Sequence, residues 1–194
     1  KVLWGGLLKS RKSAALPGAK IYPPTLTNSD LANIKIAKEM GVTGVMQPFV
    51  RDHSDLECVK EALREAGAED IRLFAKIENM DGVRKLEKLL PAADEIVIAR
   101  GDLGNAVHLW DLPGVQRQIS EKCRAAGKPF MVVTQMLASM ERSPVPTRAE
   151  VNDIFHAVMD GAASIMVTGE TAVGDYPVEV IRYMVNTVRS AEKE

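Results

Sequence analysis

A lysine and a glutamate lie two residues apart at the end of an apolar run, and their spacing could bring a cation and a carboxylate together. The run is Ile71 to Asn79, and the two side chains are Lys76 and Glu78. Alternate side chains of a strand point to the same face, so these two would project together while Ala75 and Ile77 face the other way. An isolated Lys-x-Glu is most often a salt bridge at a strand end. Its chemical meaning therefore depends on what lies beside it.

Two further strand ends supply side chains that could complete a site with this pair. Asp102 follows the next predicted strand, and two carboxylates at neighbouring strand ends, Glu78 and Asp102, suit a hard divalent cation such as Mg²⁺. Gly101 and Gly104 bracket Asp102, so backbone N–H groups there could receive a carboxylate or phosphate, although Gly-Asp-x-Gly alone is more typical of a plain turn. Thr134 could offer a hydroxyl to the same space, but a threonine at a strand end is usually explained by β propensity.

The elements that must position these residues alternate between strand and helix. Strands are predicted at residues 42–49, 71–76, 95–99, 130–134 and 164–168. They are short, rich in β-branched residues and almost continuously apolar, which is typical of strands covered on both faces of a parallel sheet. In such folds, sites are built at the carboxyl edge of the sheet. The sequence therefore predicts an α/β fold with five parallel strands, intervening helices and a site at that edge.

Capping residues, glycine and proline mark where the predicted helices begin and end. The first helix would be capped by Asn28 or Ser29 and would stop at Gly41. Two capping boxes, Ser54-x-x-Glu57 and Thr147-x-x-Glu150, would open further helices. The remaining helices are predicted at residues 82–90, at 113–126 after a loop, and from Pro177.

Composition bounds the class of protein. The chain has 194 residues, is 46% hydrophobic and carries a net charge of −1, which is the size and apolar content of one globular domain. It has no long basic run, which argues against a nucleic-acid partner, and no apolar run of membrane-spanning length. Cys58 and Cys123 have no metal-ligand spacing and favour reduced thiols in a cytoplasmic protein. Residues 1–24 are rich in turn signals and look like an entry from an upstream segment.

Six short motifs together resemble the pyruvate kinase family in their order and spacing. They are Lys76-Ile77-Glu78-Asn79, Ala99-Arg100-Gly101-Asp102-Leu103-Gly104, Ala126-Gly127-Lys128-Pro129, Thr134-Gln135-Met136-Leu137, Pro146-Thr147-Arg148-Ala149-Glu150 and Gly169-Glu170-Thr171-Ala172. The resemblance implies the second part of a (β/α)₈ TIM barrel, strands four to eight. Residues 1–24 would then re-enter the barrel from a lid domain, and residues 25–194 would form the C-terminal portion of the barrel.

The same resemblance implies a function and a set of site residues. The family transfers the phosphoryl group of phosphoenolpyruvate to ADP, giving pyruvate and ATP in glycolysis. Position by position, Lys76 and Thr134 resemble catalytic residues, Glu78 and Asp102 the ligands of Mg²⁺ or Mn²⁺, and Lys76, Arg100, Gly101, Asp102 and Thr134 the substrate-binding residues. The resemblance further implies K⁺ if the first three strands are supplied, a cytoplasmic location, and a homo-oligomer or completion by further barrel strands. The isolated segment is expected to be inactive.

The sequence also departs from the family at several positions. Pro48 stands where the family commonly has serine, Val173 where a lysine near the nucleotide is usual, and Asn105 to Leu112 replaces the usual Ile-Glu-Ile-Pro run. Nucleotide binding is therefore the part of the resemblance with least support. Two alternatives stay open: a lyase or aldolase that acts on a pyruvate enolate with the same metal, and a non-catalytic fragment completed by another chain.

Histidines and a tryptophan outside these motifs have structural interpretations. His53, His108 and His156 have no partner at ligand spacing and are expected at surface or helix positions. Trp110 would be either a contact surface or a buried anchor.

Overall fold

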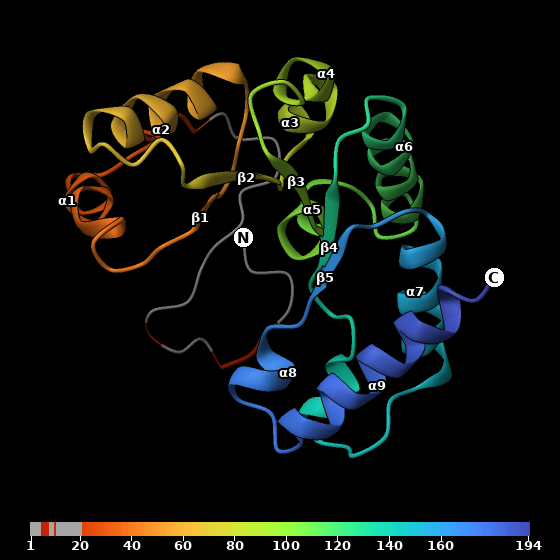
Figure 1. Cartoon of the computed structure of the whole chain (residues 1–194). Helices are drawn as coiled ribbons and strands as arrows, with labels where there is room; N and C mark the ends of the chain where they lie inside the picture. The colour runs from red at the N-terminus through yellow and green to blue at the C-terminus, as the bar shows by residue number, and fades with distance from the viewer. Residues whose placement is uncertain (1–4, 8–9, 11–20) are drawn as a thin grey trace.

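Five parallel strands form one sheet, in the order in which they occur along the chain (Figure 1). The computed structural model describes residues 5–7, 10 and 21–194. The strands are β1 (Gly44–Gln47), β2 (Arg72–Ile77), β3 (Glu95–Ala99), β4 (Phe130–Val133) and β5 (Ser164–Met166). Each pairs in parallel with the next. The predicted α/β class and parallel five-strand sheet are thus confirmed, while most of the predicted re-entry segment, residues 1–24, lies outside the described residues.

Helices connect the strands and cover the sheet. They are α1 (Asn28–Ala37), α2 (His53–Glu65), α3 (Met80–Arg84), α4 (Leu86–Leu89), α5 (Arg100–Ala106), α6 (Leu112–Ala125), the short 3₁₀ helix η1 (Ala138–Glu141), α7 (Arg148–Met159), α8 (Gly169–Ala172) and α9 (Pro177–Ala191). In Figure 1, α1 and α2 lie at the β1 end of the sheet, while α7 and α9 lie together near its β4 and β5 end. No helix in the described ranges has both the length and the apolar character needed to cross a membrane.

The two faces of the sheet contribute to different apolar clusters. The outer face, which carries Ala75 and Ile77, packs with the helices into the main core. The inner face holds a smaller cluster of Val97, Ala99 and Val133, flanked by partly buried side chains of Phe74, Met131 and Met166. Lys76 and Glu78 belong to the opposite alternation from Ala75 and Ile77, as their spacing predicts. Both polar side chains therefore emerge at the carboxyl end of the inner face.

The helix caps agree with the sequence in two places and differ in two. The Thr147 and Glu150 capping box and the start at Pro177 are confirmed. The first helix is capped by Thr27, with Asp30 completing the box, and not by Asn28 or Ser29. The second is capped by Asp52 with Asp55 as its reciprocal partner, and not by Ser54 with Glu57.

The shift of the second cap has a physical cause. Ser54 lies inside the first turn, where both its N–H and its hydroxyl donate to the Asp52 carboxylate, at 3.0 and 2.5 Å. Asp52, the residue before the helix, thus accepts one of the N–H groups of the first turn that have no partner within the helix. Aspartate and serine are both favoured at the N-cap, so Asp52 and Ser54 were both candidates and the pattern alone did not determine where the helix begins.

Three predicted boundaries near the site are also different in the structure. The first strand ends at Gln47, because Phe49 adopts φ +52° and turns the chain out of the extended conformation. The single helix predicted at 82–90 is two short helices, α3 and α4, separated at Lys85, whose ψ of 9° is not helical. The loop predicted after Ala99 is helix α5, where the fully buried Leu103 anchors a glycine-rich segment against its low helix propensity.

Candidate active site

The carboxyl end of β2 brings Lys76 and Glu78 into direct contact. Lys76 Nζ lies 2.7 Å from Glu78 Oε1, and the two side chains are 24% and 2% exposed. A buried carboxylate needs compensation for lost hydration, and the ammonium group supplies part of it. The expectation that both side chains lie together at the end of the strand is therefore confirmed.

A backbone donor from the neighbouring strand end completes the surroundings of Glu78. Phe49 donates its N–H to Glu78 Oε2 at 2.7 Å. Phe49 is one of the few non-glycine residues with positive φ in the described chain, so the chain turns sharply at the residue that donates to Glu78. Asn79 adds a second link, since it caps α3 through Gly82 and donates to the Val50 carbonyl. The end of β1 is thus fastened to the end of β2 through the site.

The end of β3 supplies Arg100, Gly101 and Asp102 as the first residues of α5. Asp102 is exposed, and no hydrogen bond or ion pair engages its carboxylate within the described part of the chain. Strands β2 and β3 are paired neighbours, with Ile77 opposite Ile98, so their carboxyl ends are adjacent. The structure therefore places the two predicted metal ligands at adjoining strand ends, one buried and one open to solvent.

Arg100 is held by the protein through all three of its guanidinium nitrogens. Nη2 and Nε donate to the Thr134 carbonyl oxygen, at 2.7 and 3.3 Å, and Nη2 also contacts Met136 Sδ at 2.8 Å. Nη1 donates to Asp153 of α7 at 2.8 Å. The Arg100 side chain is 12% exposed. Asp153 was not identified from the sequence, where an aspartate inside an amphipathic helix gives no signal of a distant partner.

The end of β4 holds a strained turn. Thr134 has φ +82° and Gln135 has φ +56°. A β-branched residue rarely adopts positive φ, and each such residue costs about 1–3 kcal/mol. Gly101 packs against this turn, since a Cβ at that position would lie 3.1 Å from Thr134 Cγ2. The structure thus brings Gly101, Arg100 and Thr134 together.

Glu170 links the end of β5 to the turn after β4. Its buried carboxylate accepts the Thr168 N–H at 2.8 Å and the Leu137 N–H at 3.2 Å. The sequence marks residues 168–171 as a polar strand end but does not reveal that Glu170 points inward. Glu170 therefore belongs to the scaffold that holds the two loops together.

The donor set at the carboxyl edge fits a hard divalent cation. Each oxygen of Glu78 has one hydrogen-bonding or ionic partner, so each retains a lone pair, and Asp102 offers an exposed carboxylate. Mg²⁺ often binds one or two carboxylates and takes its other ligands from water and substrate oxygens. Within residues 21–194 no group of three or more His, Cys, Asp and Glu side chains is arranged to hold a metal. The site can therefore hold such an ion only with help from water or substrate.

The remaining residues singled out in the sequence lie outside this constellation. His53, His108 and His156 are exposed, and His53 faces Glu57 on the same helix at 3.6 Å. Trp110 is 78% exposed and stacks on His108, so it is not a buried anchor. Cys58 is exposed and Cys123 is buried, and both are free thiols.

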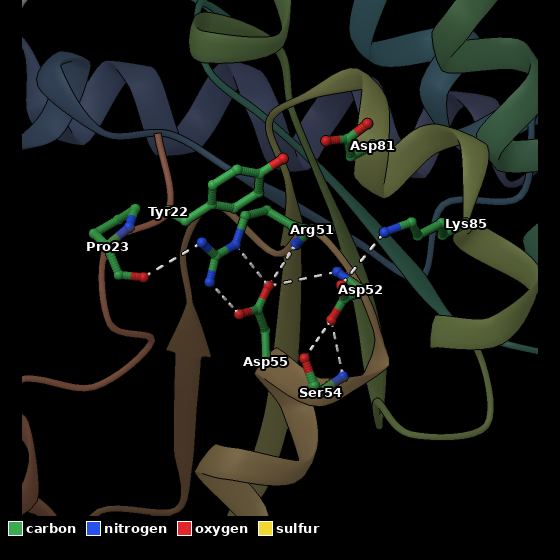
Figure 2. A pocket seen from close by; sticks show the side chains of 8 residues that line it. All are labelled: Tyr22, Pro23, Arg51, Asp52, Ser54, Asp55, Asp81 and Lys85. Atoms are coloured by element: carbon green, nitrogen blue, oxygen red, sulfur yellow. Dashed lines mark hydrogen bonds and ion pairs between the residues drawn. The ribbon is translucent and has the colours of Figure 1, made fainter. Parts of the chain in front are cut away.

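A second polar cluster lies at the start of α2 (Figure 2). Arg51 binds Asp55 through two nitrogens, at 2.5 and 3.1 Å, donates to the Pro23 carbonyl, and lies 5.9 Å from the centre of the Tyr22 ring. Burial raises the pKa of Asp55, but hydrogen bonds from Arg51 and Thr25 outweigh it and lower this pKa to about 2. The Arg51 and Asp55 charges are paired with each other, so the cluster fastens residues 22–25 to α2.

Comparison with known proteins identifies relatives along the whole chain. Residues 1–181 match the family model described as "Pyruvate kinase, barrel domain". A pyruvate kinase of Bacillus licheniformis is 42% identical over 193 residues, covering 100% of this chain and 33% of the relative. Relatives of the same name from Geobacillus stearothermophilus and Dictyostelium discoideum are each 42% identical, over 94% and 95% of this chain and 31% and 36% of their own. The chain thus spans about a third of the length of these relatives.

Proposed function

The chain belongs to the pyruvate kinase family, and we propose that the protein carrying it transfers the phosphoryl group of phosphoenolpyruvate to ADP. The contact between Lys76 and the buried Glu78, beside the end of β3 that carries Asp102, is the observation that carries this proposal. Phosphoryl transfer requires placed positive charge and a means of stabilising an enolate. The carboxyl edge offers a cation and two carboxylates for these tasks.

Each predicted residue except Arg100, whose guanidinium nitrogens all donate within the protein, has a distinct part in the proposed reaction. Lys76 would bind the transferring phosphoryl group and the enolate oxygen, because its ammonium is partly exposed while its stem is held in the sheet. Glu78 and Asp102 would hold Mg²⁺ or Mn²⁺, which when bound acts as a Lewis acid toward substrate oxygens. Gly101 would lie against the substrate carboxylate, and Thr134 near the carbon that gains a proton.

Two parts of the proposal rest on the family alone. K⁺ and the contacts that the family takes from its first three strands would be supplied by residues outside this segment. The cytoplasmic location and an oligomeric assembly likewise follow from the family. Val173 is 66% exposed at the position where the family usually has a lysine near the nucleotide, so the affinity for ADP is the quantity in which this protein should differ most from its relatives.

A coupled assay for ATP formation tests the proposal. The sample is the natural polypeptide that carries residues 1–194 with whatever flanks them, called here the parent polypeptide. We expect ATP to form from phosphoenolpyruvate and ADP in the presence of Mg²⁺ and K⁺. Turnover of a pyruvate-derived substrate without ATP formation would favour the lyase or aldolase alternative, which needs the same Lys76, Glu78 and Asp102 but no nucleotide.

A further inference from the structure

The backbone of Thr134 is held in a conformation that its own sequence does not favour. Thr134 and Gln135 both have positive φ, directly after β4. Neither residue is a glycine, and a branched Cβ makes the left-handed region especially unfavourable. Such a conformation persists only where the surrounding structure fixes it. The contacts that fix it here come from two other elements.

Arg100 makes those contacts with the Thr134 backbone, and Asp153 in turn holds Arg100. The planar guanidinium places two donors on the Thr134 carbonyl oxygen and a third on the Asp153 carboxylate, whose Oδ2 lies 2.7 Å from Nη1. Arg100 begins α5 after β3, whereas Asp153 lies in the middle of α7. The pair therefore links the turn after β4 to helix α5, earlier in the chain than this strand, and to helix α7, later in the chain. Asp153 is 32% exposed and has no other ionic partner among the described residues.

We propose that Arg100 and Asp153 are a positioning pair that sets the Thr134 hydroxyl for the protonation step of the reaction. This inference rests on the proposed function. Neither residue needs to touch substrate, since every nitrogen of Arg100 already donates within the protein. The pair acts on the backbone of Thr134, and Gly101 leaves room for its methyl group. Asp153 acts one step further away, by orienting the guanidinium.

Protonation can be measured apart from phosphoryl transfer. Run backwards, the step removes a methyl proton from pyruvate and forms the enolate, and return of a deuteron from D₂O restores pyruvate with one C–H replaced by C–D. Exchange of the methyl hydrogens therefore reports on Thr134 and its surroundings. Both rates depend on Lys76 and the metal ligands, but ATP formation does not require Thr134, because an enolate once formed can be released and protonated in water.

The test compares these two rates in the parent polypeptide carrying Asp153→Asn, with Arg100→Lys as a second variant. Arg117→Lys is the control, because Arg117 also binds a carboxylate, that of Glu121 on the surface of α6, at 2.8 Å. We expect methyl exchange to fall by about tenfold more than ATP formation in both variants, because small misplacements of reacting groups cost large factors in rate. The control should leave the ratio of the two rates unchanged. Circular dichroism of each variant establishes that the fold is retained.

Two results would overturn the proposal, and they are distinguishable from failure of the kinase function. Equal losses of exchange and ATP formation in Asp153→Asn and Arg100→Lys would show that the pair merely maintains the amount of folded enzyme. Unchanged rates in both variants would show that Thr134 needs no such support. A wild-type polypeptide that exchanges the methyl hydrogens but makes no ATP would overturn the kinase function, while the effect on exchange would still decide the positioning role.

Discussion

At the scale of single residues, the spacing of Lys76 and Glu78 on a strand identified the central pair. The structure then showed which groups compensate the buried charge of Glu78. Lys76 and Glu78 could be placed on one face from the period of two. The hydrogen bond from the Phe49 N–H to Glu78 and the hydrogen bond from Arg100 to Asp153 could not be predicted, because each joins residues far apart in sequence. Positive φ at Thr134 was equally invisible, since threonine at a strand end ordinarily indicates extended backbone.

The two carboxylates should determine metal affinity. Changing Glu78→Gln together with Asp102→Asn in the parent polypeptide removes both anionic ligands, so we expect calorimetric affinity for Mn²⁺ to fall by at least about tenfold, since Mg²⁺-type ions depend on carboxylate oxygens. Glu121→Gln, which removes a surface carboxylate, is the control and should have no effect. Unchanged affinity in the double variant would exclude these residues as the ligands.

Asp55 should make stability depend on acidity. Its pKa is lowered from 3.8 to about 2, so its contribution is fully present above pH 3.8 and is lost as pH falls through 2. One pKa unit corresponds to about 1.4 kcal/mol, which limits the contribution to roughly 2 kcal/mol. Replacing Asp55→Asn should therefore lower the free energy of unfolding near neutral pH and have little effect near pH 2. Urea titrations of the wild-type and Asp55→Asn proteins from pH 2 to 7 measure the difference in their free energies of unfolding. A difference that does not become smaller as the pH falls would contradict the lowered pKa of Asp55.

At the scale of elements, the alternation of strands and helices was predictable, whereas the short helices at the carboxyl edge were not. Local apolar runs and capping signals fixed five strands and the longer helices. Helix α5 forms in a segment containing Gly101 and Gly104, because burial of Leu103 outweighs propensity. Helices α3 and α4 separate at Lys85, close to where Asn79 and Gly82 dock onto the β1 to α2 connection. Tertiary contacts decided these boundaries.

Glu170 should hold two loops of the site together. In Glu170→Ala the Leu137 and Thr168 N–H groups lose their acceptor. Thr168 is exposed, but Leu137 is buried, and a buried unsatisfied group costs about 1–3 kcal/mol. We expect faster hydrogen exchange at residues 136–140 and 168–172, with little change in β2. Glu121→Ala is the control, because an exposed ion pair contributes about 0–1 kcal/mol. Uniform acceleration across the chain, or none, would show that Glu170 does not have this local role.

At the scale of the whole molecule, the sheet that the described residues form is open. Strands β1 and β5 each pair with a single neighbour in the described chain, and Met46, which lies beside Phe74 of the inner face, is 39% exposed. Unpaired edges beside apolar surface invite further pairing. The two unpaired edges follow from the five-strand topology, which was predicted from the strand count and from the resemblance to an eight-stranded barrel.

The 194-residue segment alone should therefore fail to behave as a stable monomer. We expect sedimentation to show self-association or an expanded chain, and hydrogen exchange of β1 and β5 amides to be faster than that of β3 amides. A compact monomer with both edges as well protected as β3 would show that the open sheet is self-sufficient.

The central claim is that the β2 strand end performs phosphoryl transfer, and Lys76→Met tests it most directly. Methionine keeps an unbranched stem of similar volume but removes the charge, which leaves the buried Glu78 carboxylate with the Phe49 N–H as its remaining partner. Circular dichroism of the variant establishes that the fold is retained. The control is Lys38→Met, which breaks an exposed ion pair with Asp70 on the far side of the β1 to β2 unit from the site.

The measurement is the rate of ATP formation from phosphoenolpyruvate and ADP by the parent polypeptide with each substitution. We predict a loss of at least about a hundredfold in Lys76→Met, comparable to removal of one key electrostatic donor, and no loss in the control. Turnover of Lys76→Met within about tenfold of wild type would contradict the account, since misplaced or missing charge at the reacting group should cost more than that.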